Sequence, residues 1–267
     1  MIRNVLSIAG SDPSGGAGIQ ADLKAFSARR VYGMAALTAL TAQNTQGVSG
    51  VHPVPPQFVA QQIKAIFADV RVDAVKIGMI ANAAIAEAVA DALSAHRGVP
   101  IVLDPVMIAK GGAALLAADA VDVLTDRLLP LATLLTPNLP EAAALLHEPV
   151  AENRETMARQ AEALAKLGPL AVLVKGGHLV GDESPDVLAG PQGLTWFEAD
   201  RVPTRNTHGT GCTLSSALAA EIAKGSSLAD AVTIAKQYLA GAVAAAETLS
   251  VGTGHGPVQH FYELWPV

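Results

Sequence analysis

The chain alternates short, continuously apolar runs with longer segments in which apolar residues recur every three or four positions. Strands that are covered on both faces read as continuous apolar runs, so these runs predict the buried strands of a parallel sheet. The predicted strands lie at residues 5–9, 34–42, 73–78, 100–104, 132–136 and 170–175.

The longer segments have the spacing of amphipathic helices. They lie at residues 17–30, 55–70, 82–96, 153–167, 209–224 and 227–248, and residues 184–199 read as a hairpin that turns at 190–193. Alternating strands and helices predict an α/β fold, in which helices cover a mainly parallel sheet. No repeat or low-complexity linker divides the chain, so we expect one domain over residues 1–267.

Composition narrows the class of protein. Apolar residues make up 51% of the chain and charged residues 16%, which excludes a disordered protein. The net charge of −6 and the lack of a basic run argue against nucleic acid as a partner. No apolar stretch is long enough to span a membrane. The first apolar run is too short for a signal peptide and one cysteine cannot form an internal disulfide, so we expect a cytoplasmic protein.

Polar clusters follow the predicted strands. They are Ser11-Asp12, Gln43-Asn44, Gly78-Met79, Asp104-Pro105, the residues from Asn138 to Glu141, and the residues from Lys175 to His178. The carboxyl ends of parallel strands share one edge of a sheet, where ligands of open α/β folds bind. We therefore expect an active site at this edge.

Two glycine-rich stretches link strands to helices. Residues 11–24 read SDPSGGAGIQADLK, which is neither a GxGxxG nor a GxxxxGK[ST] motif. A tight turn with a helix cap explains this stretch as well as a ligand loop does. Residues 206–212 read NTHGTGC, where free amides at a helix start and the hydroxyls of Thr207 and Thr210 favour an anion site over a simple turn. A thiol at a helix start should have a lowered pKa, which we expect of Cys212.

Three charged residues complete the candidate chemistry. Asp104 and Glu141 could hold a hydrated Mg²⁺ beside a polyphosphate, since hard cations take oxygen ligands. Glu141 is equally explained as a residue in the first turn of a helix that Pro140 begins. Lys175, at a strand end beside two glycines, could reach a phosphate or could be a solvated turn residue. His178 and His208 lack the spacing of zinc ligands.

Taken together, these motifs resemble the ribokinase-like kinases, and most closely the hydroxymethylpyrimidine/phosphomethylpyrimidine kinases of thiamine biosynthesis. The matching motifs are AGSDPSGGAGIQADLKAF at 9–26, TALTAQNTQGV at 38–48, KIGM at 76–79, DPVM at 104–107, LTPNLPEA at 135–142, VKGGH at 174–178, NTHGTGCTLSSA at 206–217 and GHGPVQHF at 254–261. The resemblance implies a three-layer α/β/α fold and, commonly, a homodimer. It also implies that ATP and Mg²⁺ serve to phosphorylate 4-amino-5-hydroxymethyl-2-methylpyrimidine and then its monophosphate.

The resemblance also assigns residues. It places Gly10, Ala17, Asp22, Gln43, Met79 and Val106 against the pyrimidine; Asn138, Lys175 and Thr207 against ATP; Asp104 and Glu141 at the metal; and Gly209, Thr210, Gly211 and Cys212 at the anion hole. The Gln43 amide can both donate to and accept from an aminopyrimidine edge, while Met79 and Val106 would supply apolar walls. Asp22 could either touch the substrate or shape its loop.

Cys212 stands where the wider ribokinase family has an aspartate base, and the pyrimidine kinases have cysteine there. We expect either that its thiolate accepts the substrate's hydroxyl proton or that the thiol only borders the site. Two alternatives to the pyrimidine kinase stay open: a pyridoxal kinase, which phosphorylates a similar hydroxymethyl group, and a non-catalytic protein that binds a thiamine precursor.

Overall fold

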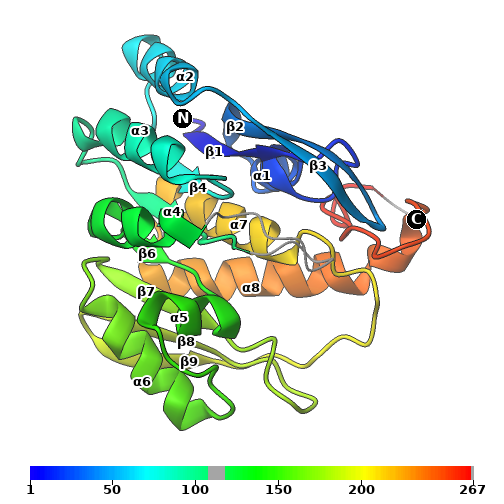
Figure 1. The fold of residues 1–267 in the computed structure, drawn as a ribbon. Helices are drawn as coiled ribbons and strands as arrows, with labels where there is room; N and C mark the ends of the chain where they lie inside the picture. Colours follow the sequence, from blue (N-terminus) through cyan, green and yellow to red (C-terminus); the bar gives the residue numbers. More distant parts are fainter. Residues whose placement is uncertain (108–117, 266–267) are drawn as a thin grey trace.

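The computed structural model describes residues 1–107 and 118–265. Within them lies a nine-stranded sheet with the order β3-β2-β1-β4-β5-β6-β7-β8-β9 (Figure 1). The strands are β1 (Asn4–Ser11), β2 (Tyr32–Asn44), β3 (Gly47–Pro53), β4 (Ala74–Ile77), β5 (Ile101–Leu103), β6 (Leu134–Leu135), β7 (Ala171–Lys175), β8 (Asp186–Gly190) and β9 (Gly193–Phe197). The strands from β2 to β7 pair in parallel, which confirms the predicted sheet.

Helices cover both faces of the sheet. They are α1 (Gly18–Ala28), α2 (Pro56–Asp69), α3 (Ala83–Ser94), α4 (Ala118–Val123), α5 (Leu139–Leu146), α6 (Arg154–Ala165), α7 (Thr210–Lys224) and α8 (Leu228–Ala244). One core lies between the sheet and α2 to α6, and the other lies between the sheet and α1, α7 and α8. The three layers are those predicted, and α7 and α8 lie side by side in the layer that also contains α1 (Figure 1).

Alternation along β1 explains how one strand serves both cores. Leu6 and Ile8 belong to the core of α2 to α6, whereas Val5 belongs to the core of α1, α7 and α8. Successive side chains of a strand point to opposite faces, so a buried strand must be apolar on both. The continuous apolar runs therefore predicted the central strands correctly.

Three of the strands and α-helices in the described residues lie outside the predicted ranges: β3, α4 and α5. The edge strand β3 pairs antiparallel with β2, and its sequence, GVSGVHP, is too rich in glycine to read as a strand. The helix α5 begins at the Asn138 cap, although only its proline start was read from the sequence. The hairpin of β8 and β9 turns between Gly190 and Gly193, as predicted.

Among the helices of the described residues, none combines the length and the apolar character that crossing a membrane requires.

Candidate active site

The carboxyl ends of the parallel strands open into a cavity of about 720 Å³. Its walls come from the ends of β1, β2, β4, β5 and β7 and from the first turns of α5 and α7. It is lined by Gly10, Ala17, Gln43, Met79, Asp104, Val106, Asn138, Glu141, Lys175, Thr207, Gly209, Thr210, Gly211 and Cys212. All the predicted site residues except Asp22 therefore line one cavity.

Asp22 does not line the cavity, in contrast to the prediction. Its side chain is fully buried in α1, where its carboxylate accepts hydrogen bonds from Ser7, Lys76 and Ser216 at 2.6 to 2.9 Å. These donors come from β1, β4 and α7. The Asp22 carboxylate therefore connects α1 to β1, β4 and α7.

Apolar groups form one end of the cavity. Met79 lies against Gly10, and a Cβ at residue 10 would overlap its terminal methyl group. The Thr38 hydroxyl donates to the carbonyl oxygen of Met79 at 2.6 Å, which fixes the segment after β4. Val106 stands across the cavity in the segment after β5. This end can therefore receive a flat apolar ring, and a flexible thioether packs well against one.

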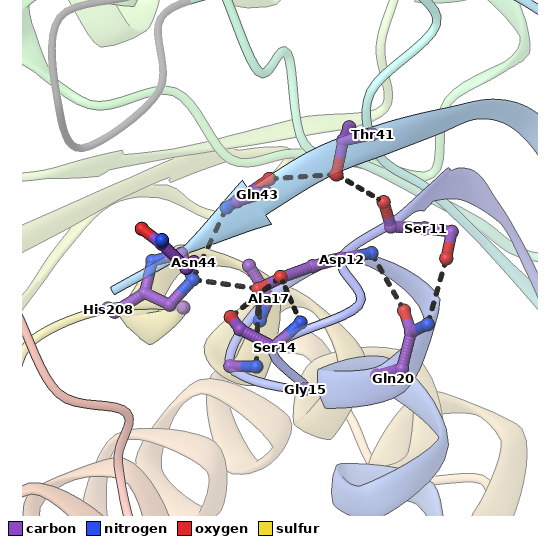
Figure 2. Close-up of polar contacts among 12 residues, drawn as sticks. Ser11, Asp12, Ser14, Gly15, Ala17, Gln20, Thr41, Gln43, Asn44 and His208 are labelled. Atoms are coloured by element: carbon purple, nitrogen blue, oxygen red, sulfur yellow. Dashed lines mark hydrogen bonds and ion pairs between the residues drawn. The ribbon is translucent and has the colours of Figure 1, made fainter. Parts of the chain in front are cut away.

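The Asp12 carboxylate organises the glycine-rich loop between β1 and α1. One oxygen accepts from the amide and the hydroxyl of Ser14 at 2.9 and 2.7 Å. The other accepts from the amides of Gly16 and Ala17 at 3.2 and 2.8 Å. Burial opposes ionisation, but hydrogen bonds from His208 and Ser14 hold the pKa of Asp12 below its ordinary value. Figure 2 shows this loop wrapped around the carboxylate.

His208 joins three segments at the polar end of the same wall. Its Nε2 lies 2.8 Å from Asp12 Oδ2 and 3.4 Å from the Gln43 side-chain amide (Figure 2). The amide is drawn with its nitrogen toward His208 and its oxygen 3.2 Å from the Thr41 hydroxyl. The same hydroxyl lies 2.8 Å from the Ser11 carbonyl oxygen. Sequence reasoning gave neither Asp12 nor His208 a role, because zinc spacing was the only signal tested at His208.

The turn before α7 supplies backbone amides to the cavity. Gly209 has φ 78° and ψ 9°, which a glycine adopts without strain. A Cβ at this position would overlap the carbonyl oxygen of Gly16, so only glycine fits between the two loops. The helix then starts at Thr210, and its first amides have no intrahelical partner. Free amides and the positive helix end favour an anion here.

Cys212 lies in the first turn of α7, half-buried at the cavity wall. Burial raises the pKa of its thiol to about 11, and the charges of Asp22 and Asp104 add to the rise. The charge of Lys76 and a hydrogen bond from the Gly18 amide act in the opposite direction and do not offset it. The prediction of a lowered pKa is therefore wrong: loss of hydration outweighs the helix start.

Lys175 brings a positive charge to the anion turn. Its Nζ lies 2.9 Å from Asp104 Oδ1 and 4.0 Å from Glu141 Oε2. Burial alone would lower its pKa, but the charges of Asp104 and Glu141 outweigh this and raise the pKa. Both the Lys175 Nζ and an Asp104 oxygen would lie 3.6 Å from a Cβ at Gly211. The cation therefore stands directly beside the free amides of α7.

Glu141 both caps a helix and faces the cavity. It forms a capping box with Asn138, whose amide donates to its carboxylate at 2.8 Å. The same carboxylate lines the cavity, and burial, aided by the charge of Asp104, raises its pKa to about 7. Capping α5 and facing the cavity are thus compatible.

Asp104 and Glu141 could bind a metal ion only together with water or phosphate ligands. Within residues 1–107 and 118–265, no three His, Cys, Asp or Glu side chains gather closely enough to hold a metal ion by themselves. Asp104 and Glu141 supply two carboxylates at the same cavity wall. Mg²⁺ keeps several waters and takes phosphate oxygens as ligands, so two carboxylates suit it.

A second buried ion pair, between Lys236 and Asp186, also lines the cavity. Lys236, on α8, reaches Asp186 Oδ2 at 2.5 Å and the Ser184 carbonyl at 2.7 Å. The Gly176 amide donates to the other oxygen of Asp186 at 2.9 Å. Sequence reasoning missed this pair, because Lys236 lies within a helix and carries no local motif.

Comparison with known proteins agrees with this geometry. The family model "Phosphomethylpyrimidine kinase" matches residues 12–259. The hydroxymethylpyrimidine/phosphomethylpyrimidine kinase of Salmonella typhimurium is 54% identical over 262 residues, which are 98% of each chain.

Two solved structures share the fold. One is an ADP complex of Bacillus subtilis pyridoxal kinase, with a TM-score of 0.90, 34% identity, and coverage of 98% of this chain and 99% of the other. The other is the phosphomethylpyrimidine kinase of Clostridium difficile, with a TM-score of 0.79, 42% identity, and coverage of 89% and 98%. The fold is thus the ribokinase-like one predicted, and the chain belongs to the phosphomethylpyrimidine kinase family.

Proposed function

We propose that this chain transfers the γ-phosphoryl group of ATP to the hydroxymethyl group of 4-amino-5-hydroxymethyl-2-methylpyrimidine, and then phosphorylates the monophosphate. One observation carries the proposal: a single cavity joins the Gln43 amide and its apolar walls to the anion turn of α7. The amide suits an aminopyrimidine edge, and the turn suits a phosphate. Membership of a kinase family supports phosphoryl transfer.

Phosphoryl transfer needs positioning and charge stabilisation more than covalent chemistry. In this proposal, Thr207 and Asn138 contact the nucleotide, while Lys175 and the amides of residues 209–212 stabilise the charge on the transferred group. Asp104 and Glu141 hold the hydrated Mg²⁺, which when bound neutralises phosphate charge.

Cys212 then serves as a neutral wall where the substrate hydroxyl and the phosphate meet. With a pKa of about 11, the thiol is protonated at neutral pH and cannot accept the hydroxyl proton. The transition state of phosphoryl transfer is loose, so the attacking hydroxyl does not require a strong base to remove its proton. We therefore favour the bordering role over the thiolate role.

An assay of ATP consumption with and without the pyrimidine tests the function. We expect substrate-dependent release of ADP, with monophosphate and then diphosphate seen by ³¹P nuclear magnetic resonance. Pyrimidine-independent hydrolysis, or no turnover with the pyrimidine bound, would contradict the proposal and favour a precursor-binding protein. If the monophosphate accumulates and no diphosphate forms, the second phosphorylation is not catalysed by this chain.

Pyridoxal kinase is the second candidate. The similarity to the Bacillus subtilis pyridoxal kinase, at a TM-score of 0.90, supports it. Both substrates offer a hydroxymethyl group on a nitrogen heteroaromatic ring, so the same phosphate end would serve. Steady-state kcat/KM for the two substrates decides, and we expect the aminopyrimidine to be preferred.

The expected homodimer and the cytoplasmic location remain proposals. The first rests on the family resemblance and the second on the single cysteine and the biosynthetic role of the relatives. Sedimentation velocity measures the oligomeric state directly, and a single species of about twice the chain's 27.2 kDa is the expected result.

A further inference from the structure

One nitrogen of His208 touches two different side chains at the polar wall of the cavity. The ring comes from the turn before α7 and is 7% exposed. Its Nε2 lies 2.8 Å from Asp12 Oδ2 and 3.4 Å from the amide nitrogen, Nε2, of Gln43 (Figure 2). Since one ring nitrogen cannot donate and accept at the same time, the first contact decides the second.

The Asp12 contact requires a hydrogen on Nε2. An ionised carboxylate only accepts hydrogen bonds, and Asp12 is ionised because its four backbone and side-chain donors stabilise the charge. His208 therefore donates from Nε2 to Asp12. Two donors then face each other, because the structure draws the amide nitrogen of Gln43 toward Nε2. Turning the amide by 180° puts its oxygen, an acceptor, on the His208 side.

The Thr41 contact leads to the same conclusion independently. A hydroxyl carries one hydrogen, and that of Thr41 is taken by the Ser11 carbonyl at 2.8 Å. The structure draws the Gln43 amide oxygen 3.2 Å from the Thr41 hydroxyl, which has no second hydrogen to donate to it. The Thr41 oxygen can only accept from Gln43. The amide nitrogen must therefore face Thr41. The two ends of an amide differ little in size, so their hydrogen-bond partners determine the orientation.

We propose that His208 is a positioning residue that determines substrate class by fixing the orientation of the Gln43 amide. With the oxygen held on the His208 side and the nitrogen on the Thr41 side, Gln43 presents one fixed order of acceptor and donor to the cavity. An aminopyrimidine has an exocyclic N–H donor next to a ring-nitrogen acceptor and matches one order only. A pyridine ring with a phenolic hydroxyl lacks that amine. The inference rests on the proposed function.

The His208 ring lies close against Gly16, and the His208 backbone is hydrogen-bonded. A Cβ at Gly16 would overlap the Cδ2 atom of His208 and would lie 3.0 Å from its Nε2, so the absence of a side chain makes room for the imidazole. The His208 amide donates to the Gly256 carbonyl at 3.0 Å. The orientation of the Gln43 amide therefore depends on a ring that cannot easily move away.

A double-mutant cycle tests the inference. The dissociation constant of the pyrimidine is measured by calorimetry, without nucleotide, for wild type, Gln43→Ala, His208→Phe and the double variant. Phenylalanine fills the space of the ring and removes its N–H. We expect His208→Phe to weaken binding about five- to tenfold, the size of one hydrogen bond's net contribution. The double variant should bind no more weakly than Gln43→Ala alone, because His208 acts through Gln43.

Three further measurements separate positioning from a structural role. His208→Gln restores an N–H donor and should recover most of the affinity. The dissociation constant of ATP should change less than twofold in His208→Phe. The exposed His52 on β3 provides the control, since His52→Phe should leave pyrimidine binding unchanged. Additive losses in the cycle, or equal weakening of ATP and pyrimidine, would overturn the inference.

The tautomer of His208 gives a readout that needs no substrate. Two-bond ¹H–¹⁵N correlation spectra, assigned by comparison with His208→Gln, should show hydrogen on Nε2. A ring protonated only on Nδ1 overturns the inference directly. Binding without phosphorylation contradicts the proposed function alone, and an additive cycle in an active kinase contradicts this inference alone. A wild type that does not bind the pyrimidine contradicts both.

Discussion

The Lys76 ammonium nitrogen lies 2.9 Å from both carboxylate oxygens of Asp22, and neither side chain is exposed to solvent. The hydroxyls of Ser7 and Ser216 donate to the same carboxylate. Burial alone would lower the pKa of Lys76, but Asp22 and other nearby negative charges outweigh this and raise it. The pair thus joins β4 to α1, and Lys76 also lines the cavity.

Removing one partner of this pair should cost much of the protein's stability. We expect Asp22→Asn to lower the free energy of unfolding by about 3–5 kcal/mol, because Lys76 is left as an uncompensated buried charge. Urea denaturation measures the loss. The control is Asp91→Asn, which breaks an exposed pair with Arg127 and should cost less than about 1 kcal/mol. Similar losses for the two variants would contradict the expectation.

The Cys212 thiol should react slowly with alkylating agents at neutral pH. Only the thiolate reacts, so with a pKa of about 11 the rate with iodoacetamide should rise about tenfold per pH unit from pH 7 to 10. Mass spectrometry follows the reaction cleanly, since the chain has a single cysteine. A rate that reaches its plateau by pH 8 would show instead a thiol activated by the helix start.

Replacing Cys212 should leave most of the turnover intact. Removal of a general base typically lowers the rate 10²- to 10⁴-fold. Because the thiol is neutral, we expect kcat of Cys212→Ser and Cys212→Ala to fall less than about tenfold. A loss of a hundredfold or more in both variants would restore the thiolate base.

The Glu141 carboxylate should make magnesium dependence sensitive to pH. Its pKa of about 7 means that most of the group is ionised at pH 8 and protonated at pH 6. Only the ionised form binds a cation, so the Mg²⁺ concentration for half-maximal kcat/KM should rise roughly tenfold as the pH falls through this range. Glu141→Gln should need more Mg²⁺ at every pH and lose the pH dependence. An unchanged Mg²⁺ dependence in this variant removes Glu141 from the metal site.

His260 should make the fold sensitive to acid. Burial, aided by the charge of Lys24, lowers its pKa to about 4, and its Nε2 lies 3.0 Å from the Thr213 hydroxyl on α7. His260 binds a proton more readily in the unfolded chain than in the folded protein. Its contribution to the free energy of unfolding is therefore complete above about pH 6.5 and falls as the pH drops towards 4. The melting temperature of His260→Gln should lose part of its dependence on pH between 6.5 and 4.5. If the melting temperature depends on pH equally in the variant and the wild type, His260 is not a source of the acid sensitivity.

Local patterns in the sequence predicted most of the architecture. Val5, Leu6 and Ile8 lie in one short, mostly apolar run because β1 is covered on both faces, and such runs mark buried strands. The sequence pattern did not predict the edge strand β3, because this strand is half-exposed and carries two glycines. The cap of α5 at Asn138 is also a local signal, though a short one.

The sequence by itself determined which residues meet at the cavity, because the carboxyl ends of parallel strands share one edge of the sheet. It therefore placed Asp104 and Lys175 together, 71 positions apart in the chain. Only the tertiary structure decided their charge states and partners. Asp22 pairs with Lys76 across 54 positions and His208 with Asp12 across 196. Hydration and the charges of distant segments set the pKa of Cys212, and neither is visible in local spacing.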